Sequence, residues 1–201
     1  MGKIFYVMGK SSSGKDTIYR RLTEDQTLKL HTIVGYTTRP MREKEENGRE
    51  YFFVTEEELK ALTAAGKVIE CRSYDTVYGV WYYFTVDDEQ VVLDRQDYVL
   101  IGTLESYLQV ADYYGTDTQG EPVVVPLYIE VEDGERLLRA IEREKRQAVP
   151  GYREVCRRFL ADCEDFSQEK LRQAGISDIY ENDDLEVCYA KLRGKILASK
   201  A

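Results

Sequence analysis

The fold is decided by the stretch Ile4-Phe5-Tyr6-Val7-Met8-Gly9-Lys10-Ser11-Ser12-Ser13-Gly14-Lys15-Asp16-Thr17. Its first five residues are apolar and mostly β-branched or aromatic, which predicts a buried strand over 4–8. Ile18 and Leu22, four residues apart, predict a helix over about 14–24. A glycine-rich turn between a strand and a helix aims backbone N–H groups at an anion, and the helix start adds its positive dipole end. The stretch therefore predicts a phosphate-binding loop (P-loop), against the alternative of a Ser/Gly/Lys surface turn.

The loop fits Gly-x-x-x-x-Gly-Lys as far as Lys15, which would reach the β and γ oxygens of a nucleoside triphosphate. The next position normally holds a Ser or Thr that binds Mg²⁺. Here it is Asp16, whose hard carboxylate oxygen suits Mg²⁺ directly or through water, so Asp16 is the candidate metal ligand. We expect ATP to contact Gly9, Ser11, Ser12, Ser13, Gly14, Lys15, Asp16 and Thr17.

Composition and charge place the chain among single-domain globular proteins. It has 201 residues, of which 43% are hydrophobic and 32% charged. The net charge of −9 argues against a nucleic-acid partner, which requires a basic surface. A local phosphate site remains compatible with that charge.

The cysteines and the lengths of the apolar runs indicate the cellular compartment of the protein. The chain has four cysteines, Cys71, Cys156, Cys163 and Cys188, and none forms a Cys-x-x-Cys pair. Because His31 is the one histidine, the sequence offers no zinc site. We therefore expect small buried thiols in a reducing cytosol. No apolar run is long enough to cross a membrane, so we expect a cytoplasmic protein without a membrane partner. The sequence leaves the oligomeric state open between a monomer and a homodimer.

Short apolar runs alternate with helical patterns along most of the chain. Further strands are predicted over 30–34, 98–101, 123–129 and 176–180, and further helices over 104–115, 133–148, 152–172 and 184–198. This alternation predicts an α/β fold of the P-loop type, with a parallel sheet covered by helices on both faces.

Two regions interrupt the alternation. Residues 35–90 contain short strands over 51–54, 68–72 and 81–85, and a helix that Thr55 and Glu58 begin with a capping box. We interpret them as a small antiparallel insertion on the α/β core. Residues 134–165 are a second unusual region, with two charged helical pieces broken at Pro150-Gly151. The core would then comprise about 1–34, 91–132 and 174–201 of a single domain.

A second phosphate site is predicted after the strand over 30–34. It reads Thr37-Thr38-Arg39-Pro40-Met41-Arg42-Glu43-Lys44-Glu45-Glu46-Asn47-Gly48-Arg49-Glu50-Tyr51. Two arginines three apart, a glycine turn and a tyrosine can hold one phosphate from several sides, because guanidinium groups bind phosphate bidentately. Taken alone, such charged runs are usually solvated loops.

The string Thr-Thr-Arg-x-x-Arg-x-x-Glu-x-x-Gly-x-x-Tyr-x-Phe, complete through Phe53, resembles the GMP-binding signature of guanylate kinases. The likeness extends to Val68-Ile69-Glu70, Tyr78-Gly79 and Asn182-Asp183-Asp184-Leu185. It implies that Arg39, Arg42, Tyr51 and Tyr78 hold the acceptor phosphate and that Glu45 orients the arginines. It further implies that Glu70 reads a base N–H and that Asn182 contacts the adenine of ATP.

The departures from that family's pattern cluster around the base. Gly35 and Val80 stand where the family has hydroxyl side chains that contact guanine, and Thr103 takes the position of an aspartate at a strand end. Each buried donor lost from a base pocket weakens discrimination by about 1–3 kcal/mol. We therefore expect the phosphate grip to be intact and the base preference to be open.

The resemblance also implies that residues 35–90 form an acceptor-binding insertion and that residues 134–165 form a helical lid, whose arginines in this family stabilise the charge on the transferring phosphoryl group. Aligning the lid on Leu137 and Ile141 puts Ala140 and Glu144 at the family's arginine positions. Our candidates are Arg143, Arg146, Arg157 and Arg158, and the alternative for each is a solvated helix face with i,i+4 ion pairs.

The resemblance implies an ATP- and Mg²⁺-dependent nucleoside monophosphate kinase, most simply one that converts GMP to GDP. One rival keeps the chemistry and changes the acceptor to another monophosphate or a sugar phosphate, as Gly35 and Val80 suggest. The other rival is a binding module without catalysis, like the guanylate kinase-like domains of scaffold proteins. The intact Gly14 and Lys15 argue against it.

Overall fold

The computed structural model describes residues 1–43, 45–76 and 79–200, and its main sheet is parallel throughout. The strand order is β2-β7-β1-β8-β9, with strands β1 (Ile4–Met8), β2 (Leu30–Thr32), β7 (Asp97–Gly102), β8 (Val124–Glu130) and β9 (Ile179–Glu181). Each neighbouring pair runs in the same direction, as the alternation of strands and helices predicts. The P-loop follows the central strand.

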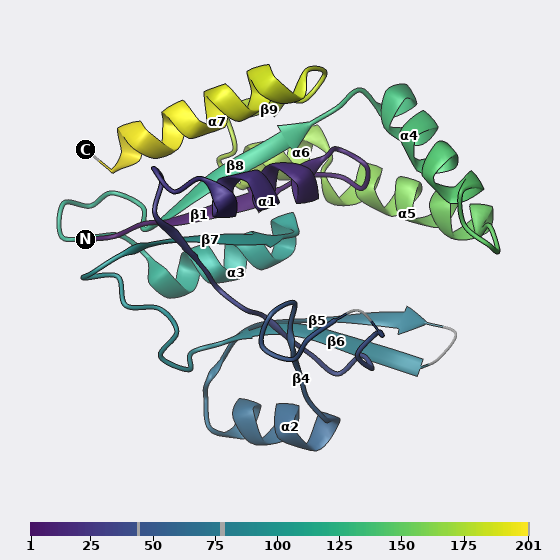
Figure 1. The fold of residues 1–201 in the computed structure, drawn as a ribbon. Helices are drawn as coiled ribbons and strands as arrows, with labels where there is room; N and C mark the ends of the chain where they lie inside the picture. Colours follow the sequence, from purple (N-terminus) through teal and green to yellow (C-terminus); the bar gives the residue numbers. More distant parts are fainter. Residues whose placement is uncertain (44, 77–78, 201) are drawn as a thin grey trace.

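Alternate side chains of β1 build two cores, one on each face of the sheet. Phe5 and Val7 pack against α1 (Lys15–Glu24) and α7 (Leu185–Ser199). Tyr6 and Met8 belong to the other core, with α3 (Leu104–Tyr114) and α6 (Gln168–Gln173). Successive strand residues point to opposite faces, so a strand that is apolar at every position must be covered on both sides. Figure 1 shows α1 and α7 on one side of the sheet and α3 on the other.

The predicted helix over 152–172 is wrong as a single element. The structure has α5 (Tyr152–Asp165) and α6, separated by Phe166 and Ser167. Phe166 leaves the helical conformation and stacks on Tyr128 of β8, with ring centroids 5.6 Å apart. Burial of this ring in the core outweighs the local preference for a continuous helix.

The last strand of the main sheet lies further along the chain than the predicted 176–180. Gly175 adopts a positive φ of 68°, and the Ile176 N–H bonds to the Leu171 carbonyl, so both residues close the end of α6. The strand β9 consequently begins at Ile179. The helix predicted over 133–148 is α4 (Asp133–Lys145), three residues shorter at its end.

A second, smaller sheet lies beneath the main sheet in the view of Figure 1. Its order is β4-β3-β6-β5, with β3 (Tyr36–Thr37), β4 (Phe52–Phe53), β5 (Val68–Thr76) and β6 (Gly79–Val86). The pairs β3–β6 and β5–β6 are antiparallel, but β3 and β4 are parallel. The expectation of an antiparallel sheet is therefore wrong for this pair, because the long loop over 38–51 brings the chain back alongside β3 in the same direction.

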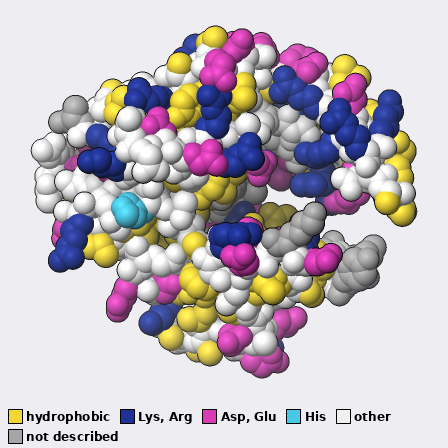
Figure 2. Space-filling model, in the orientation of Figure 1, with side chains coloured by type: hydrophobic (Ala, Val, Ile, Leu, Met, Phe, Trp, Pro, Cys, Tyr) yellow, Lys and Arg dark blue, Asp and Glu magenta, His cyan; other side chains and the backbone are white. Residues whose placement is uncertain are grey.

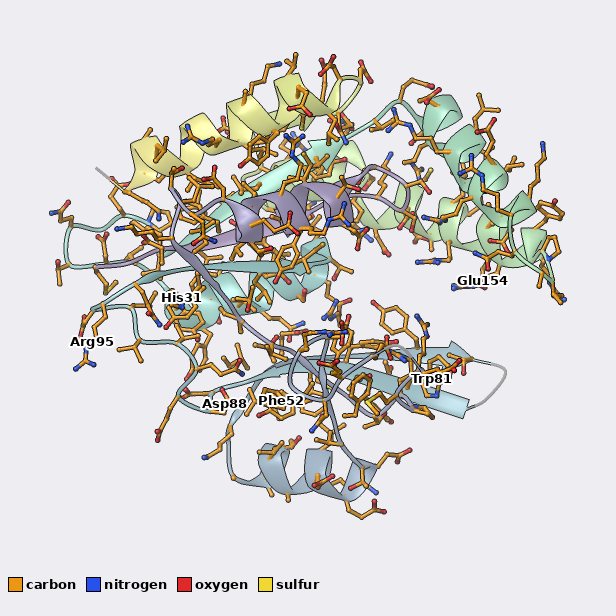
Figure 3. The ribbon with its side chains drawn as sticks, viewed as in Figure 1. His31, Phe52, Trp81, Asp88, Arg95 and Glu154 are labelled. Carbon is orange, nitrogen blue, oxygen red and sulfur yellow. The ribbon has the colours of Figure 1, made fainter. Side chains whose placement is uncertain are left out.

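The helix α2 (Glu56–Ala64) covers the small sheet and begins as predicted. The Thr55 hydroxyl accepts from the Glu58 N–H, and the Glu58 carboxylate accepts from the Thr55 N–H, which is a complete capping box. Leu59 of this helix packs on Phe84 and Val86. The Phe52 ring, labelled in Figure 3, tilts against Tyr36, whose hydroxyl bonds to Asp88.

Hydrogen bonds from Gln90 and Arg72 are among the contacts that join the two sheets. The Gln90 side chain donates to and accepts from the Val34 backbone, with distances of 3.1 and 3.0 Å, and so ties the two connecting segments together. Arg72 of β5 donates to the Thr103 hydroxyl at the start of α3 across 3.4 Å. The small sheet is thereby held beneath the carboxyl end of the main sheet, where P-loop proteins bind their ligands.

The helices α4 and α5 project beyond the main sheet, and a hollow opens between them and the small sheet. Figure 2 shows this hollow with Lys and Arg side chains gathered along the edge that α4 and α5 form. Figure 3 places Glu154 of α5 and Trp81 of β6 on opposite sides of it. Among the described helices, none combines the length and the apolar character that crossing a membrane requires.

The four thiols are free, but the expectation that they are all buried is wrong. Cys188 is buried against the main sheet, whereas Cys71 and Cys156 are exposed and Cys163 is half-buried. Burial raises the pKa of the Cys188 thiol to about 11, which makes that thiol unreactive at neutral pH.

Candidate active site

The P-loop needs glycine at both ends for reasons that only the packing shows. Gly14 precedes α1 with a positive φ of 83°, and a Cβ there would overlap the amide of Asn182. A Cβ on Gly9 would overlap the carbonyl of Ile129 on the neighbouring strand β8. The loop is therefore wedged between β8 and the segment after β9.

Several donors of the loop suit a polyphosphate. The hydroxyls of Ser12 and Ser13 are buried without a hydrogen-bond partner among the described residues. An unpaired buried hydroxyl costs free energy that a phosphate oxygen in the loop can recover. Lys15 and Thr17 stand half-buried in the first turn of α1, at the positive end of its dipole. The chemistry of this loop therefore fits the phosphates of ATP.

Asp16 stands at the mouth of the loop. Its side chain is 85% exposed, and its carboxylate lies 3.7 Å from the Lys15 ammonium. No group of three or more His, Cys, Asp or Glu suited to a metal occurs among residues 1–43, 45–76 and 79–200. Mg²⁺ in kinases is usually held by one or two carboxylates together with water and substrate phosphates, so a single exposed aspartate fits it.

Asn182 supports the loop from behind. It is 5% exposed, and its side-chain amide donates to the Ser13 carbonyl across 2.8 Å. Its backbone N–H bonds to the Glu130 carbonyl at the end of β8. Asn182 is thus a packing and hydrogen-bonding partner of the P-loop. The sequence gave no sign of this contact, because Asn182 and Ser13 are 169 positions apart.

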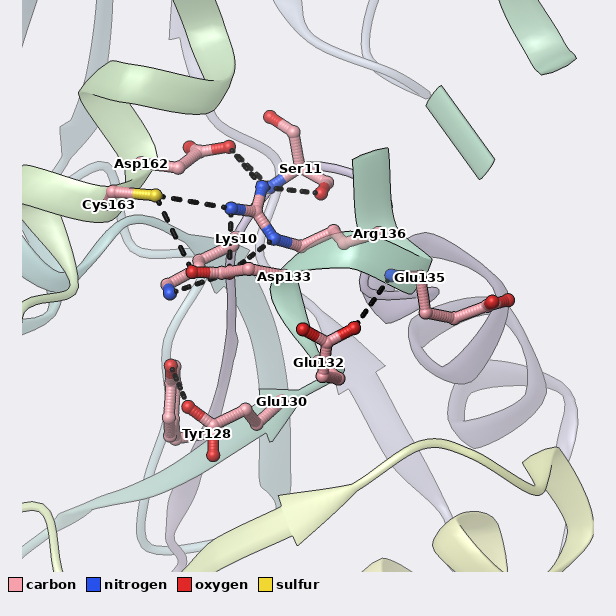
Figure 4. A network of polar contacts seen from close by, with 10 residues as sticks. All are labelled: Lys10, Ser11, Tyr128, Glu130, Glu132, Asp133, Glu135, Arg136, Asp162 and Cys163. Carbon is pink, nitrogen blue, oxygen red and sulfur yellow. Dashed lines mark hydrogen bonds and ion pairs between the residues drawn. The ribbon is translucent and has the colours of Figure 1, made fainter. Parts of the chain in front are cut away.

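A network of charges joins the P-loop to α4 and α5 (Figure 4). Its centre is Arg136 of α4, whose side chain is 1% exposed and which the sequence analysis did not single out. Arg136 donates to Asp133, to Asp162 of α5 and to the Ser11 carbonyl, at distances of 2.9, 3.3 and 3.2 Å. The guanidinium also lies 4.4 Å from the centroid of the Phe159 ring.

Two further bonds of this network reach the loop. Asp162 accepts from the Ser11 N–H across 2.8 Å, and Lys10 donates to Asp133 across 3.0 Å. Burial alone would raise the pKa of Asp133, but Lys10 and Arg136 outweigh it and hold the pKa below its usual value. The first residues of the P-loop are therefore fastened to α4 and α5 by ionised groups.

The four lid arginines divide into two pairs. Arg143 and Arg158 line a cavity of about 220 Å³ that Ser11 of the P-loop also lines. Arg146 caps the exposed end of α4. Arg157 is bonded to Glu154 at 2.7 and 2.8 Å, and this pairing raises its pKa. The structure thus brings Arg143 and Arg158 toward the loop and leaves Arg146 and Arg157 outside that cavity.

A larger cavity, of about 540 Å³, lies beside Lys10 and differs in character. It is lined by Lys10, Glu130, Val131, Glu132, Asp133, Cys163, Phe166, Ser167, Gln168, Glu181 and Asp183. Five carboxylates against one ammonium repel a polyanion, so we do not assign the phosphates of a nucleotide to this cavity.

On the small sheet, Arg39 is fixed in place by its own loop. It is 4% exposed and forms a bidentate pair with Glu45, at 2.8 and 2.9 Å. Its guanidinium lies 5.9 and 5.4 Å from the ring centroids of Tyr51 and Phe53. Burial would lower the pKa of Arg39, but its hydrogen bonds to Glu45 and the effects of Tyr83 outweigh burial, so Arg39 stays a cation. Its Nε is buried without a hydrogen-bond partner among the described residues.

Of the other predicted phosphate ligands, Arg42 and Tyr51 lie beside this pair. Glu45 also accepts from the Arg42 N–H across 2.8 Å, while the Arg42 side chain is exposed. The hydrogen bond from Arg39 is the main reason why the pKa of Glu45 is lowered. Tyr78 lies outside the described residues.

The start of α1 and the loop that carries Arg39 lie near one another. Burial raises the pKa of Tyr51, and the charges that act on it include Asp16 of α1 as well as Arg39 and Arg72. Burial also raises the pKa of Tyr19 in α1 to about 12, with a smaller effect from Tyr51. Such coupling requires the start of α1 and the Arg39 loop to lie within electrostatic reach of one another.

Glu70, the predicted base reader, is 2% exposed and already has partners. Its carboxylate accepts from Arg72 at 2.9 and 3.2 Å and from the Thr85 hydroxyl at 2.8 Å. Thr103 is the N-cap of α3, and its hydroxyl accepts from the Ser106 N–H and from Arg72. The sequence did not indicate Arg72 and Thr85, because no motif marks them. The available signal for Arg72 was the strand period of two, which puts the side chains of residues 70 and 72 on the same face of the strand.

Comparison with known proteins gives a consistent result. A model of the guanylate kinase family matches residues 1–100. The chain is 31% identical over 201 residues to a guanylate kinase of Symbiobacterium thermophilum, covering 100% of this chain and 87% of the relative. It is 30% identical over 188 residues to a guanylate kinase of Homo sapiens, covering 92% and 87%. A crystal structure of guanylate kinase from Anaplasma phagocytophilum superimposes with a TM-score of 0.66 at 19% identity, covering 98% of this chain and 86% of that chain, which shows a shared fold.

Proposed function

Because the chain belongs to the guanylate kinase family, we propose that it transfers the γ-phosphoryl group of ATP to GMP and releases ADP and GDP. The proposal includes the division into a core, an acceptor-binding insertion over about 35–90 and a lid over about 134–165. It also includes a cytoplasmic location without a nucleic-acid partner, in keeping with the net charge of −9.

The observation that supports this proposal is that two groups of potential anion ligands lie near one another. One is the P-loop, with Lys15 and two buried hydroxyls that have no partner among the described residues, and the other is the buried Arg39 cation. The electrostatic coupling of Asp16 with Tyr51 supports their proximity. Two facing phosphate sites are what an in-line phosphoryl transfer between two nucleotides requires.

On the donor side, Lys15 and the start of α1 would neutralise the β and γ phosphates of ATP. Arg143 and Arg158 would add positive charge from the lid, since both line the cavity that reaches Ser11. Asp16 would hold Mg²⁺, which supplies charge neutralisation and orientation of the phosphates when bound.

On the acceptor side, Arg39, Arg42, Tyr51 and Tyr78 would bind the GMP phosphate. Glu45 would keep Arg39 in place through its two hydrogen bonds. A phosphate monoester oxygen is already a competent nucleophile, so no side chain needs to remove a proton. The residues act by holding two mutually repelling anions in line and by excluding water as the hollow closes.

The test is a substrate panel with a matched pair of variants. The purified protein receives ATP, Mg²⁺ and one of GMP, AMP, CMP, UMP or a sugar phosphate, and diphosphate formation is followed by chromatography. We expect GMP to be the best acceptor and Lys15→Ala to lower kcat/KM by roughly 10²- to 10³-fold. Lys60→Ala, a change of an exposed lysine on α2, is the control and should leave the rate unchanged.

Two other outcomes would replace the proposal. A different monophosphate as clearly the best acceptor would keep the chemistry and change the substrate. Binding of ATP and GMP without formation of any diphosphate would identify a binding module instead of an enzyme.

A further inference from the structure

The acceptor pocket contains a buried ion pair between Glu70 and Arg72. The two Glu70 oxygens accept three hydrogen bonds, two from Arg72 and one from Thr85, and the Glu70 side chain is 1% exposed. A carboxylate so engaged offers little to a base N–H. The charged group of this pair that retains access is the Arg72 guanidinium, whose side chain is 15% exposed.

Arg72 has hydrogen-bond donors to spare. A guanidinium carries five N–H groups. Nε and one N–H of Nη2 bind Glu70, and one N–H of Nη1 points to Thr103 across a long 3.4 Å, so two N–H groups remain after these three. The two that remain belong to Nη1 and Nη2, the fork that binds a pair of acceptor atoms bidentately.

The charge and position of Arg72 are both fixed. Burial would lower its pKa, but the Glu70 carboxylate and the neighbouring Tyr6 and Tyr74 raise it, so Arg72 is a permanent cation. It bridges β5 of the small sheet to Thr103, which begins α3 at the carboxyl end of β7. This is the junction of the two sheets, within electrostatic reach of Tyr51 beside the Arg39 phosphate site.

The same pocket is poor in other donors. At Gly35, a Cβ would meet its neighbours at ordinary contact distances of 3.5 and 3.8 Å, so the position has room for a side chain but carries none. Val80 is 39% exposed and offers no hydroxyl. Without hydroxyls at these two positions, recognition of a ligand base falls to the other donors of this region, of which Arg72 is the charged one beside Glu70.

We propose that Arg72, positioned by Glu70, determines base specificity by donating two hydrogen bonds to the O6 and N7 atoms of a 6-oxopurine. This inference rests on the proposed function and specifies its acceptor. Guanine presents O6 and N7 as adjacent acceptors, and arginine is their commonest bidentate partner. Adenine presents a donor amino group at position 6, which opposes an arginine N–H. The 2-amino group of guanine is left unread because Glu70 is engaged.

The inference makes a prediction for the unmodified protein. IMP has the same O6 and N7 as GMP and lacks the 2-amino group. We expect the Kd and kcat/KM of IMP to lie within about threefold of those of GMP, and those of AMP to be at least about 50-fold weaker. Binding is measured by calorimetry without ATP, so that it reports on the pocket even if no phosphoryl transfer occurs.

Variants test the arginine directly. Arg72→Ala should weaken GMP and IMP equally, by about 10- to 100-fold, with the KM of ATP unchanged and the preference for GMP over AMP nearly lost. Arg72→Lys should lose the same preference, because an ammonium cannot donate in fork geometry. Arg95→Ala is the control, since Arg95 is exposed at the margin of the molecule far from the hollow (Figure 3).

A double-mutant cycle separates the two roles. If Glu70 only positions Arg72, Glu70→Gln should weaken GMP binding in the unmodified protein and have no further effect in the Arg72→Ala background. Thermal unfolding of each variant shows whether it is folded.

Three results would overturn the inference. They are IMP bound about 50-fold or more weakly than GMP, an unchanged preference for GMP over AMP in folded Arg72→Ala, and additive effects of the two substitutions. If the unmodified protein binds 6-oxopurine monophosphates through Arg72 but transfers no phosphoryl group, the proposed activity fails and this inference stands.

Discussion

The two proposed phosphate sites of this molecule are built around buried arginines that are held in different ways. Arg39 on the acceptor side is fixed by Glu45, six residues away in the same loop. Arg136 on the donor side is fixed by Ser11 and Asp162, 125 and 26 residues away. The Arg39–Glu45 pair belongs to one segment of the chain. The contacts of Arg136 form only when three segments meet, namely the P-loop, α4 and α5.

The difference has a consequence for what each network does. The Arg39–Glu45 pair depends on one loop only. We therefore expect this loop to present the Arg39 guanidinium to a phosphate without help from other segments. The Arg136 network binds α4 and α5 to the start of the P-loop, and its stabilising effect therefore depends on the tertiary structure. A substitution should accordingly affect binding on the acceptor side and folding on the donor side.

Arg136→Met should have the largest effect on stability. The substitution leaves Asp133 and Asp162 without their buried cation, which should lower the free energy of unfolding by about 3 kcal/mol. Urea unfolding measures the change. Arg139→Met is the control on the same helix, because its pair with Glu135 is partly exposed and its two hydrogen bonds to the Asn182 carbonyl are long, at 3.5 Å, so that they should contribute less than about 1 kcal/mol. Equal losses in the two variants would remove the distinction between the two regions.

Arg39→Lys should raise the KM of the acceptor by about 10- to 100-fold and leave the KM of ATP unchanged. A lysine cannot keep both hydrogen bonds to Glu45 or bind a phosphate in fork geometry. Steady-state kinetics with either substrate varied measures the effect. Arg49→Lys in the same loop alters an exposed ion pair and should change neither value. A matching loss of ATP affinity in Arg39→Lys would mean that the two regions do not act independently.

Asp16→Ala should lower kcat by about tenfold while ATP affinity in the absence of Mg²⁺ stays constant, if this exposed carboxylate binds the metal. Turnover is measured across a Mg²⁺ titration, and metal-free ATP binding by calorimetry. Glu24→Ala, at the other end of α1, is the control. Unchanged turnover in Asp16→Ala would exclude Asp16 as the ligand.

The smallest effect concerns acid stability on the acceptor side. The pKa of Glu45 is lowered in the folded protein, mainly by the Arg39 hydrogen bond. Its contribution is therefore complete above the unfolded value of about 4.3 and is lost as the pH falls through the folded pKa. Glu45→Gln should lower stability at pH 7 by about 1 kcal/mol and make it less dependent on pH below about 4. Urea midpoints at several pH values measure this, and parallel curves for the two proteins would contradict it.

Features with short-range causes were predictable from the sequence. The capping box of Thr55 and Glu58, the P-loop between β1 and α1 and the two-faced burial of β1 all follow from residues a few positions apart. The pairing of Arg39 with Glu45 lies within the quoted acceptor segment. In each case, the residues that cause the feature lie within one short segment of the chain.

Features with long-range causes were missed or displaced. The break between α5 and α6 depends on Phe166 stacking on Tyr128, and the start of β9 depends on how α6 ends. Arg136 was not among the arginines predicted for the lid, yet its side chain is buried. Glu70 was predicted as a free acceptor, and only the pairing with Arg72 and Thr85 reveals that its oxygens are engaged.

The sequence by itself determined the parallel α/β sheet, the P-loop and the acceptor segment, because period, turn chemistry and motif are local properties of the chain. The tertiary structure decided which charges are buried and what they contact: Arg136 against the P-loop, and Arg72 between Glu70 and Thr103. Burial makes a charge depend on its partners, and those partners come from distant segments that only the packed fold brings together.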